Sequence, residues 1–183
     1  AADQVDLTFY DQLDRVLMTQ SAAAWVSTTP TAHRTWSEYD AAGNLTRFTD
    51  ALGRETVFEY DALTRRTRVV HPDGTSQQTV FDAAGRRAAQ TDQAGKTTLY
   101  GYDPLGRLTA VTNALGHVTR YEYDELGRLT RQIDALNRAT RYEHDALGRR
   151  TRRILPLGQV ERLSYDAVGN LLTRADFNGR VTT

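Results

Sequence analysis

The chain has 183 residues, enough for one domain by length, and its 23 basic and 23 acidic side chains give a formal net charge of zero. This balance excludes a global electrostatic attraction to nucleic acid or to a membrane surface. Cysteine is absent, which excludes disulfides, thiolate catalysis and cysteine-based zinc sites, and no apolar run reaches the ~18 residues that a membrane-spanning helix needs.

The first part of the chain, residues 1–38, is interpreted as a degenerate repeat with an inserted loop. Tyr10-Asp11 opens the sequence YDQLDR, and the next Tyr-Asp pair begins at Tyr39. This interval is longer than the constant interval between all later pairs, so an insertion separates the first two. We expect the insertion in a loop at Thr19–Pro30, because insertions in repeat proteins map to loops. A short amphipathic helix over Ala22–Val26 is the alternative.

Residues 39–183 form the second predicted region, a set of tandem repeats. An aromatic or histidine anchor followed by Asp recurs at a constant interval, at Tyr39, Tyr60, Phe81, Tyr102, Tyr123, His144 and Tyr165. A fixed period of about 20 to 50 residues indicates a repeat architecture in which each unit buries its apolar face against its neighbours.

Each repeat carries two turn signals of the form D-x-x-G. The Asp side chain accepts a hydrogen bond from a backbone N–H two residues on, and the Gly supplies the positive φ that closes the turn. We expect positive φ at the first-turn glycines and at Asn137, which replaces Gly in one second turn; the glycines are Gly43, Gly85, Gly106, Gly127, Gly148 and Gly169. Thr64 replaces Gly in one first turn, which predicts either strain or a different turn, and Asp14 stands at the same place in the first copy.

The segments between the turns are short and rich in Thr, Val, Leu, Tyr and Arg, which is typical of strands. Tyrosines occur at the anchors or two residues before them, so their rings share a face and predict an aromatic ladder between neighbouring strands. The predicted fold is all-β: tandem 21-residue hairpins in a curling antiparallel strip. Sixteen or so strands exceed what an open sheet usually tolerates, and the strip is expected to be a piece of a longer chain.

The residues YDELGRLTRQIDALNRATRYEHDALGRR resemble YD-repeat, or RHS-repeat, proteins, whose motif YDxxGRLTxxxDxxGxxTxY recurs along residues 39–183. The resemblance implies that the strip is part of a hollow spiral shell that encloses a C-terminal toxin or effector domain until delivery. Relatives include type VI secretion effectors, polymorphic toxins, the C component of Tc toxins and teneurins. Asp103-Pro104-Leu105-Gly106 is similar to the start of the DPxGL motif at which some members cut their toxin free, but Arg107 stands where Leu is expected, so we do not assign a protease site.

The resemblance also implies partners and a location. The expected partners are the rest of the same shell and an enclosed toxin domain, with secretion-spike or chaperone proteins as further candidates. We expect no contact with nucleic acid and no membrane contact by this segment. The expected route is synthesis in the bacterial cytoplasm followed by secretion. The alternative function is an extracellular adhesion or carbohydrate-binding surface, because aromatic rings stack on sugars.

No catalytic, cofactor or metal site is predicted, and we expect no enzyme activity. The arginine clusters Arg65-Arg66-Arg68 and Arg149-Arg150-Arg152-Arg153 could contact phosphate, but pairing with cross-strand carboxylates explains them at zero net charge. The turn aspartates lack the dense spacing of a calcium loop. Ser164 lies near His144 and Asp145 without forming a recognisable triad. The histidines share no metal-ligand spacing; they are His33, His71, His117 and His144.

Overall fold

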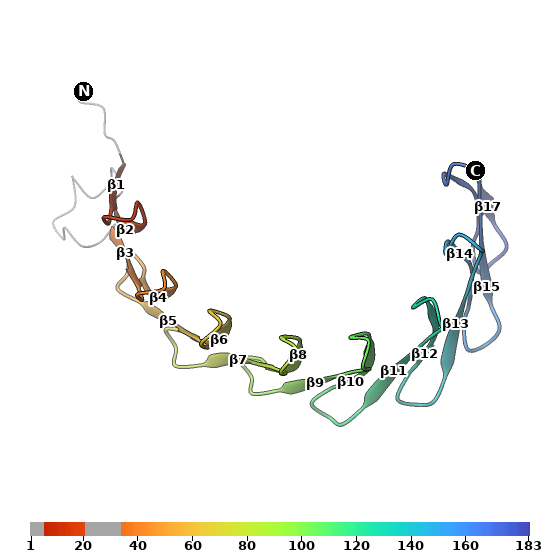
Figure 1. Ribbon diagram of the computed structural model, residues 1–183, viewed down its shortest axis with the longest axis horizontal. Helices are drawn as coiled ribbons and strands as arrows, with labels where there is room; N and C mark the ends of the chain where they lie inside the picture. The colour runs from red at the N-terminus through yellow and green to blue at the C-terminus, as the bar shows by residue number, and fades with distance from the viewer. Residues whose placement is uncertain (1–5, 21–33) are drawn as a thin grey trace. The chain divides into compact units, whose positions relative to one another are not determined.

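The computed structural model describes residues 6–20 and 34–183, and these residues form strands and turns without a helix (Figure 1). Contacts divide the chain into two units, Ala1–Thr97 and Thr98–Thr183. The strands of the first unit are β1 (Leu7–Tyr10), β2 (Val16–Gln20), β3 (Arg34–Tyr39), β4 (Leu45–Thr49), β5 (Glu55–Tyr60), β6 (Arg66–Val70), β7 (Ser76–Phe81) and β8 (Arg87–Thr91).

The second unit continues the same pattern of two strands in each repeat. Its strands are β9 (Thr97–Tyr102), which starts at the boundary, β10 (Leu108–Thr112), β11 (Val118–Tyr123), β12 (Leu129–Ile133), β13 (Ala139–His144), β14 (Arg150–Ile154), β15 (Val160–Tyr165), β16 (Leu171–Ala175) and β17 (Val181–Thr182). The predicted all-β fold is therefore confirmed.

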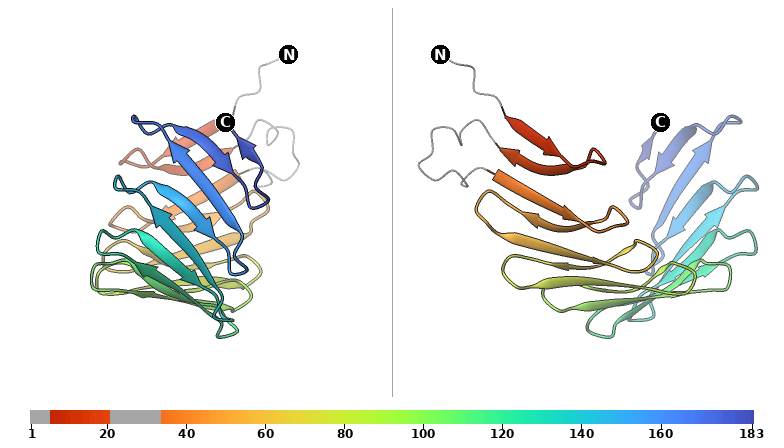
Figure 2. Two further views of the ribbon diagram at one scale, coloured as in Figure 1. Left: turned by 90° about the vertical axis from the view of Figure 1, so that its right-hand side faces the viewer. Right: turned by 60° about the vertical axis from the view of Figure 1, so that its left-hand side comes forward.

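Within each unit, every strand pairs antiparallel with the next one along the chain, from β1 to β8 and from β9 to β17. The strands of each unit lie in a single layer (Figure 2). The anchor sits at a register shift in its hairpin, as between Glu122 and Tyr123 or between Glu143 and His144. Such a bulge increases the local twist and turns the anchor side chain away from strict alternation.

The turns have the predicted backbone conformation. In the turn after β11, the Gly127 N–H donates to the Asp124 carbonyl oxygen (3.0 Å), the Asp124 N–H donates to the Arg128 carbonyl oxygen (3.0 Å), and Gly127 has φ +79°. All six first-turn glycines have positive φ, as does Asn137 (φ 59°). Thr64 keeps the same two backbone hydrogen bonds at φ 59°, so strain, not a different turn, is the outcome there. Asp14 has φ 57°.

Two further turns carry no D-x-x-G signal. His71–Thr75 and Leu155–Gln159 make the same pair of backbone hydrogen bonds, with Gly74 and Gly158 at positive φ. In the first, Asp73 Oδ1 accepts from the Thr75 N–H (2.9 Å), which replaces the missing cap from the first turn residue. A glycine with positive φ at the fourth position thus closes both turns without an Asp at the first position.

The two faces of each sheet differ in character. Tyr121 and Tyr142 are half-buried on one, the ring face, whereas Glu122, Arg141 and Arg162 are exposed on the other, the charged face. No large side chain among the described residues is completely buried, so each unit has no thick core, and stability must come from contacts between neighbouring strands.

Some expectations remain open or need correction at the N-terminal end. Thr19 and Gln20, which we placed in the inserted loop, belong to β2. The rest of that loop, the alternative helix at Ala22–Val26 and His33 lie outside the described residues. The division into residues 1–38 and 39–183 stays a prediction.

Candidate functional site

The contact that repeats along both units begins with an aspartate that organises each first turn. Asp124 Oδ1 accepts from the backbone N–H groups of Leu126 (3.0 Å) and Arg128 (2.9 Å), and Oδ2 accepts from Arg128 Nε (2.6 Å). The pKa of Asp124 lies below its ordinary value, chiefly because of the Arg128 backbone N–H, with burial acting in the opposite direction. The carboxylate therefore holds the arginine side chain in one orientation.

The arginine that follows a first turn also contacts the next repeat. Arg107, held by Asp103 (2.6 Å), donates from an Nη to the carbonyl oxygen of Asp124 (3.1 Å) and lies over the Tyr123 ring at 5.1 Å from its centroid. Arg149 makes the equivalent contacts with Asp166 and Tyr165 at 2.8 and 4.9 Å. A guanidinium over an aromatic face adds a cation–π attraction to the hydrogen bonds.

The anchor tyrosine closes the contact from the other side. The Tyr123 hydroxyl donates to the Leu108 carbonyl oxygen (2.8 Å), which belongs to the preceding repeat. Burial raises the pKa of Tyr123, the largest effect on that group, so the hydroxyl stays protonated as a donor. Equivalent hydroxyl bonds run from Tyr39 to Val16 (3.0 Å), from Tyr60 to Leu45 (2.9 Å) and from Tyr165 to Arg150 (2.9 Å).

We call this set of three residues the anchor latch: the turn aspartate, the arginine that it holds, and the anchor ring of the next repeat. Asp103, Arg107 and Tyr123 form one such latch. The sequence predicted rings stacked on rings, whereas the contacts at the anchor rings come from arginines of the preceding repeat, also at Tyr39 (Arg15, 4.6 Å) and Phe81 (Arg65, 4.4 Å). The sequence signal for this arginine–ring contact is the D-x-x-G-R spacing, because Arg follows the first turn in most repeats.

The arginine clusters divide between this latch and cross-strand pairs. Arg65 and Arg149 belong to latches, whereas Arg68 pairs with Glu59 (3.2 Å) and Arg152 with Glu143 (2.9 Å). The predicted pairing with cross-strand carboxylates is thus confirmed for those two, and Arg153 lies over the Phe177 ring at 5.5 Å.

The polar residues considered for catalysis or metal binding are not brought together. Ser164 Oγ bonds Thr173 Oγ1 (2.6 Å) on the neighbouring strand, and the His117 backbone N–H bonds Asn113 Oδ1 (3.0 Å) as part of a turn. His144 is half-buried at its anchor position. Across residues 6–20 and 34–183, no group of three or more His, Asp or Glu side chains could hold a metal ion.

The sequence did not predict one buried ionic group, which centres on Glu161. Glu161 on β15 is 2% exposed, and one of its carboxylate oxygens accepts from Arg174 Nε (2.8 Å) while an Nη of Arg150 lies 3.7 Å from the other. The alternation Val160-Glu161-Arg162-Leu163 places this carboxylate with Leu163 on the ring face. The usable signal was Glu at a position that holds Thr in the two preceding repeats, at Thr119 and Thr140.

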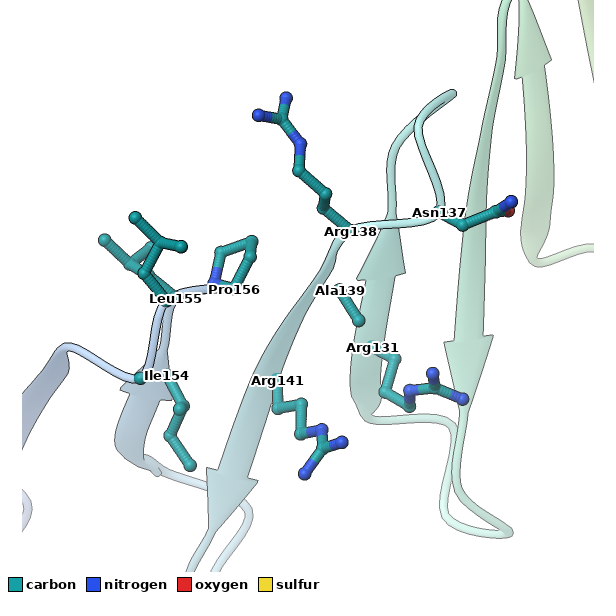
Figure 3. A pocket seen from close by; sticks show the side chains of 10 residues that line it. Arg131, Asn137, Arg138, Ala139, Arg141, Ile154, Leu155 and Pro156 are labelled. Atoms are coloured by element: carbon teal, nitrogen blue, oxygen red, sulfur yellow. The ribbon is translucent and has the colours of Figure 1, made fainter.

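The surface of the described residues includes a cationic hollow and an apolar one. A cavity of about 480 Å³ lies beside the turns Asn137–Arg138 and Leu155–Gly158, and Arg131 and Arg141 line it from adjacent strands (Figure 3). An apolar one of about 610 Å³ includes Phe9, Met18 and Trp36. The first is cationic without a carboxylate or nucleophile in its lining, which suits binding of an anion better than catalysis.

The repeats also identify the family. The family model described as RHS Repeat matches residues 39–76, 81–118, 102–139, 123–160 and 145–181. The chain belongs to the RHS repeat family. No curated protein matches this RHS chain. The part of it that the structure describes contains no helix long and apolar enough to cross a membrane.

Solved structures share the RHS fold. The TcdB2-TccC3-Cdc42 structure matches at TM-score 0.67 and 19% identity over 91% of this chain. The TcdB2-TccC3 structure matches at 0.67 and 19% over 93%, and a Photorhabdus luminescens Tc holotoxin pore with a mutant TccC3 at 0.64 and 20% over 88%. This chain spans only 10 to 11% of the length of those chains.

Proposed function

We propose that this chain is a section of wall in an RHS-repeat shell that encloses a C-terminal toxin or effector domain before delivery. The observation that carries the proposal is the match to the TcdB2-TccC3 structures over about nine-tenths of this chain. The anchor latch supports it, because each latch joins one repeat to the next, and contacts between neighbouring repeats are what stabilises an extended repeat structure.

A passive, non-enzymatic role agrees with the chemistry of the described residues. Ser164, His117 and His144 have roles in pairing, turns or packing, and none of them lies in a group with a nucleophile, a base and an oriented acid. The section therefore contributes enclosure, and the toxic activity belongs to the enclosed domain.

The proposal extends to partners and location. The rest of the same shell and the enclosed domain are the direct partners, with secretion-spike or chaperone proteins in further contact. The protein is made in the bacterial cytoplasm and acts outside the producing cell, with type VI secretion as one delivery system that would suit it. Adhesion or carbohydrate binding is the competing function.

Removal of one repeat tests the proposal. Deletion of one complete repeat, from Tyr102 to Glu122, in the full protein joins Gly101 to Tyr123 and shortens the strip by one latch. We expect the enclosed domain to become protease-sensitive, while the single variants His117→Ala and Ser164→Ala leave both enclosure and toxicity intact. Loss of activity in a soluble, folded point variant at either position would reject the passive wall, and binding on a glycan array would favour adhesion.

A further inference from the structure

The charged face of the second unit carries a row of arginines that the repeat does not require. Arg120 on β11, Arg141 on β13 and Arg162 on β15 occupy the same position in successive repeats and are exposed, and we call them the arginine row. The equivalent positions in the first unit hold uncharged residues, namely Leu7, Trp36, Val57 and Gln78. The row is thus a property of this part of the chain.

Neighbouring arginines on the same face have carboxylate partners, whereas the arginine row has none. Arg131 bonds Glu122 (2.8 Å), and Arg152 bonds both oxygens of Glu143 (2.9 and 3.0 Å). Among the described residues, the three guanidiniums of the row form no hydrogen bond, ion pair or cation–π contact. The two local carboxylates are already used, so the row is an unneutralised positive surface.

The register makes this arrangement unfavourable for the sheet alone. Arg131 lies directly opposite Arg141, and Arg152 directly opposite Arg162. Figure 3 shows Arg131 and Arg141 extending from adjacent strands. Like charges directly opposite each other destabilise an antiparallel pair. An anionic ligand on this face would relieve the like-charge cost.

We propose that the arginine row binds an extended acidic segment of a partner polypeptide. Alternate strands are roughly 10 Å apart, at ~4.8 Å per strand, and the register sets each arginine of the row two residues further along its strand than the one before, because Arg120 pairs with Ile133 and Ile133 with Ala139. The row is therefore a diagonal of three positive charges about 12 Å apart. A polyproline II segment advances ~9.3 Å in three residues, which places every third side chain on one side. The long, flexible arginine and glutamate side chains span the remaining few ångströms, so a carboxylate at every third position reaches one guanidinium after another, and each contact is a charge-assisted hydrogen bond.

The glutamates on the same face favour a polypeptide over a nucleic acid. Glu122 and Glu143 each lie two residues from an arginine of the row, on the same strand and the same face. A phosphate backbone with a charge every ~3.4 Å per strand would therefore bring phosphates close to these carboxylates. Discrete carboxylates at wide spacing avoid these positions. The proposal does not depend on the enclosing function, because the face would bind its ligand in any protein that exposes it.

Fluorescence anisotropy with a labelled peptide of six Glu-Pro-Pro units tests the proposal on the full chain. We expect binding that weakens with salt, and affinity for the matched Gln-Pro-Pro peptide that is lower by about tenfold or more, because the charge-assisted contacts are absent. The triple variant R120Q/R141Q/R162Q should bind the Glu-Pro-Pro peptide with an affinity that is lower by about the same factor. The control R47Q/R54Q/R68Q removes the same charge from the first unit and should change the affinity by less than about twofold.

Circular dichroism and thermal melting separate binding from folding. R141Q removes a like-charge pair, so its melting temperature should equal or exceed that of the parent, and this single variant serves if the triple variant does not fold. Equal affinity of the parent and the triple or single variant, or of the two peptides, overturns the proposal. A single-stranded oligonucleotide of equal charge that binds more tightly and displaces the peptide would assign the row to nucleic acid and also overturn it.

Discussion

The Tyr123 hydroxyl donates to the Leu108 carbonyl oxygen at 2.8 Å and so ties the bulge of one hairpin to the first residue of β10, the second strand of the hairpin before it. The bond crosses from one repeat to the next, beneath a guanidinium that reaches forward from Arg107. Contacts in both directions at one ring explain how a single-layer sheet without a completely buried side chain keeps its repeats in register.

Tyr123→Phe tests this bond. The ring and its contact with Arg107 remain, while the half-buried Leu108 carbonyl loses its donor, which should lower the free energy of unfolding by about 0.5–1.5 kcal/mol. Tyr121→Phe is the matched control, because no hydrogen bond of the Tyr121 hydroxyl is seen among the described residues and its removal should cost less than about 0.5 kcal/mol. Equal effects in urea denaturation would show that the hydroxyl bond is not what stabilises the latch.

Thr64 provides a test of the turn conformation. Its φ of 59° is unfavourable for a β-branched residue, so Thr64→Gly should raise the free energy of unfolding by about 1 kcal/mol. Asn137→Gly, at the same φ, should raise the free energy of unfolding by less, because Asn tolerates this conformation. Thermal and chemical denaturation measure both, and a destabilised Thr64→Gly would mean that the threonine side chain contributes more than its backbone costs.

Gly116→Ala is the converse experiment at a position where sterics do not interfere. Gly116 has φ +79°, and a Cβ there would meet nothing within 4 Å, so any loss comes from the backbone alone. We expect a loss of about 1 kcal/mol in the free energy of unfolding. A variant that melts with the parent would contradict the conformational role of the turn glycine.

The sequence predicted the strands and turns because both depend on residues close together in the chain. Asp124 and Gly127 are three positions apart, and their roles follow from side-chain chemistry and φ preference alone. The turn at Leu155–Gly158 was missed because Leu cannot cap it, and only Gly158 remained as a signal.

The latch could not be predicted in full for a different reason. Arg107 and Tyr123 belong to different repeats, and an arginine that follows a turn is equally compatible with solvent or with a carboxylate. Which contact the arginine makes depends on the register and the bulge that bring the ring beneath the guanidinium. Burial of Glu161 likewise depends on Arg150 and Arg174 from flanking strands.

The turn carboxylates predict loss of stability in acid. In Asp61 the pKa is lowered chiefly by the Arg65 side-chain hydrogen bond, with burial opposing it, and in Asp124 chiefly by the Arg128 backbone N–H. Because the folded pKa lies below the unfolded one, each contributes stability that is complete above the ordinary Asp pKa and is lost as pH falls through the folded value. Denaturation from pH 6 to pH 2 should show a falling free energy of unfolding.

Asp124→Asn provides the control for this pH dependence. The amide can still cap the turn, but it does not titrate, so the variant should be less stable than the parent at pH 6 and the difference should shrink towards pH 2. Asn113 caps an equivalent turn with the same two backbone bonds, which shows that the amide is tolerated. A difference that stays constant over this range would mean that the Asp124 carboxylate does not carry the pH dependence.

Glu161 should be the most sensitive single charge in the second unit. Glu161→Gln keeps the shape but removes the charge that faces Arg174 (2.7 Å) and Arg150 (3.7 Å), and the loss of charged hydrogen bonds should cost about 1.5–3 kcal/mol. Both arginines are about half exposed, so water compensates them in part and keeps the cost below the ~3–5 kcal/mol of a completely buried pair. Glu143→Gln removes an exposed partner of Arg152 and should cost less than about 1 kcal/mol. The two variants, compared by urea denaturation at pH 7, decide whether burial or mere pairing matters, and equal costs would refute the special role of Glu161.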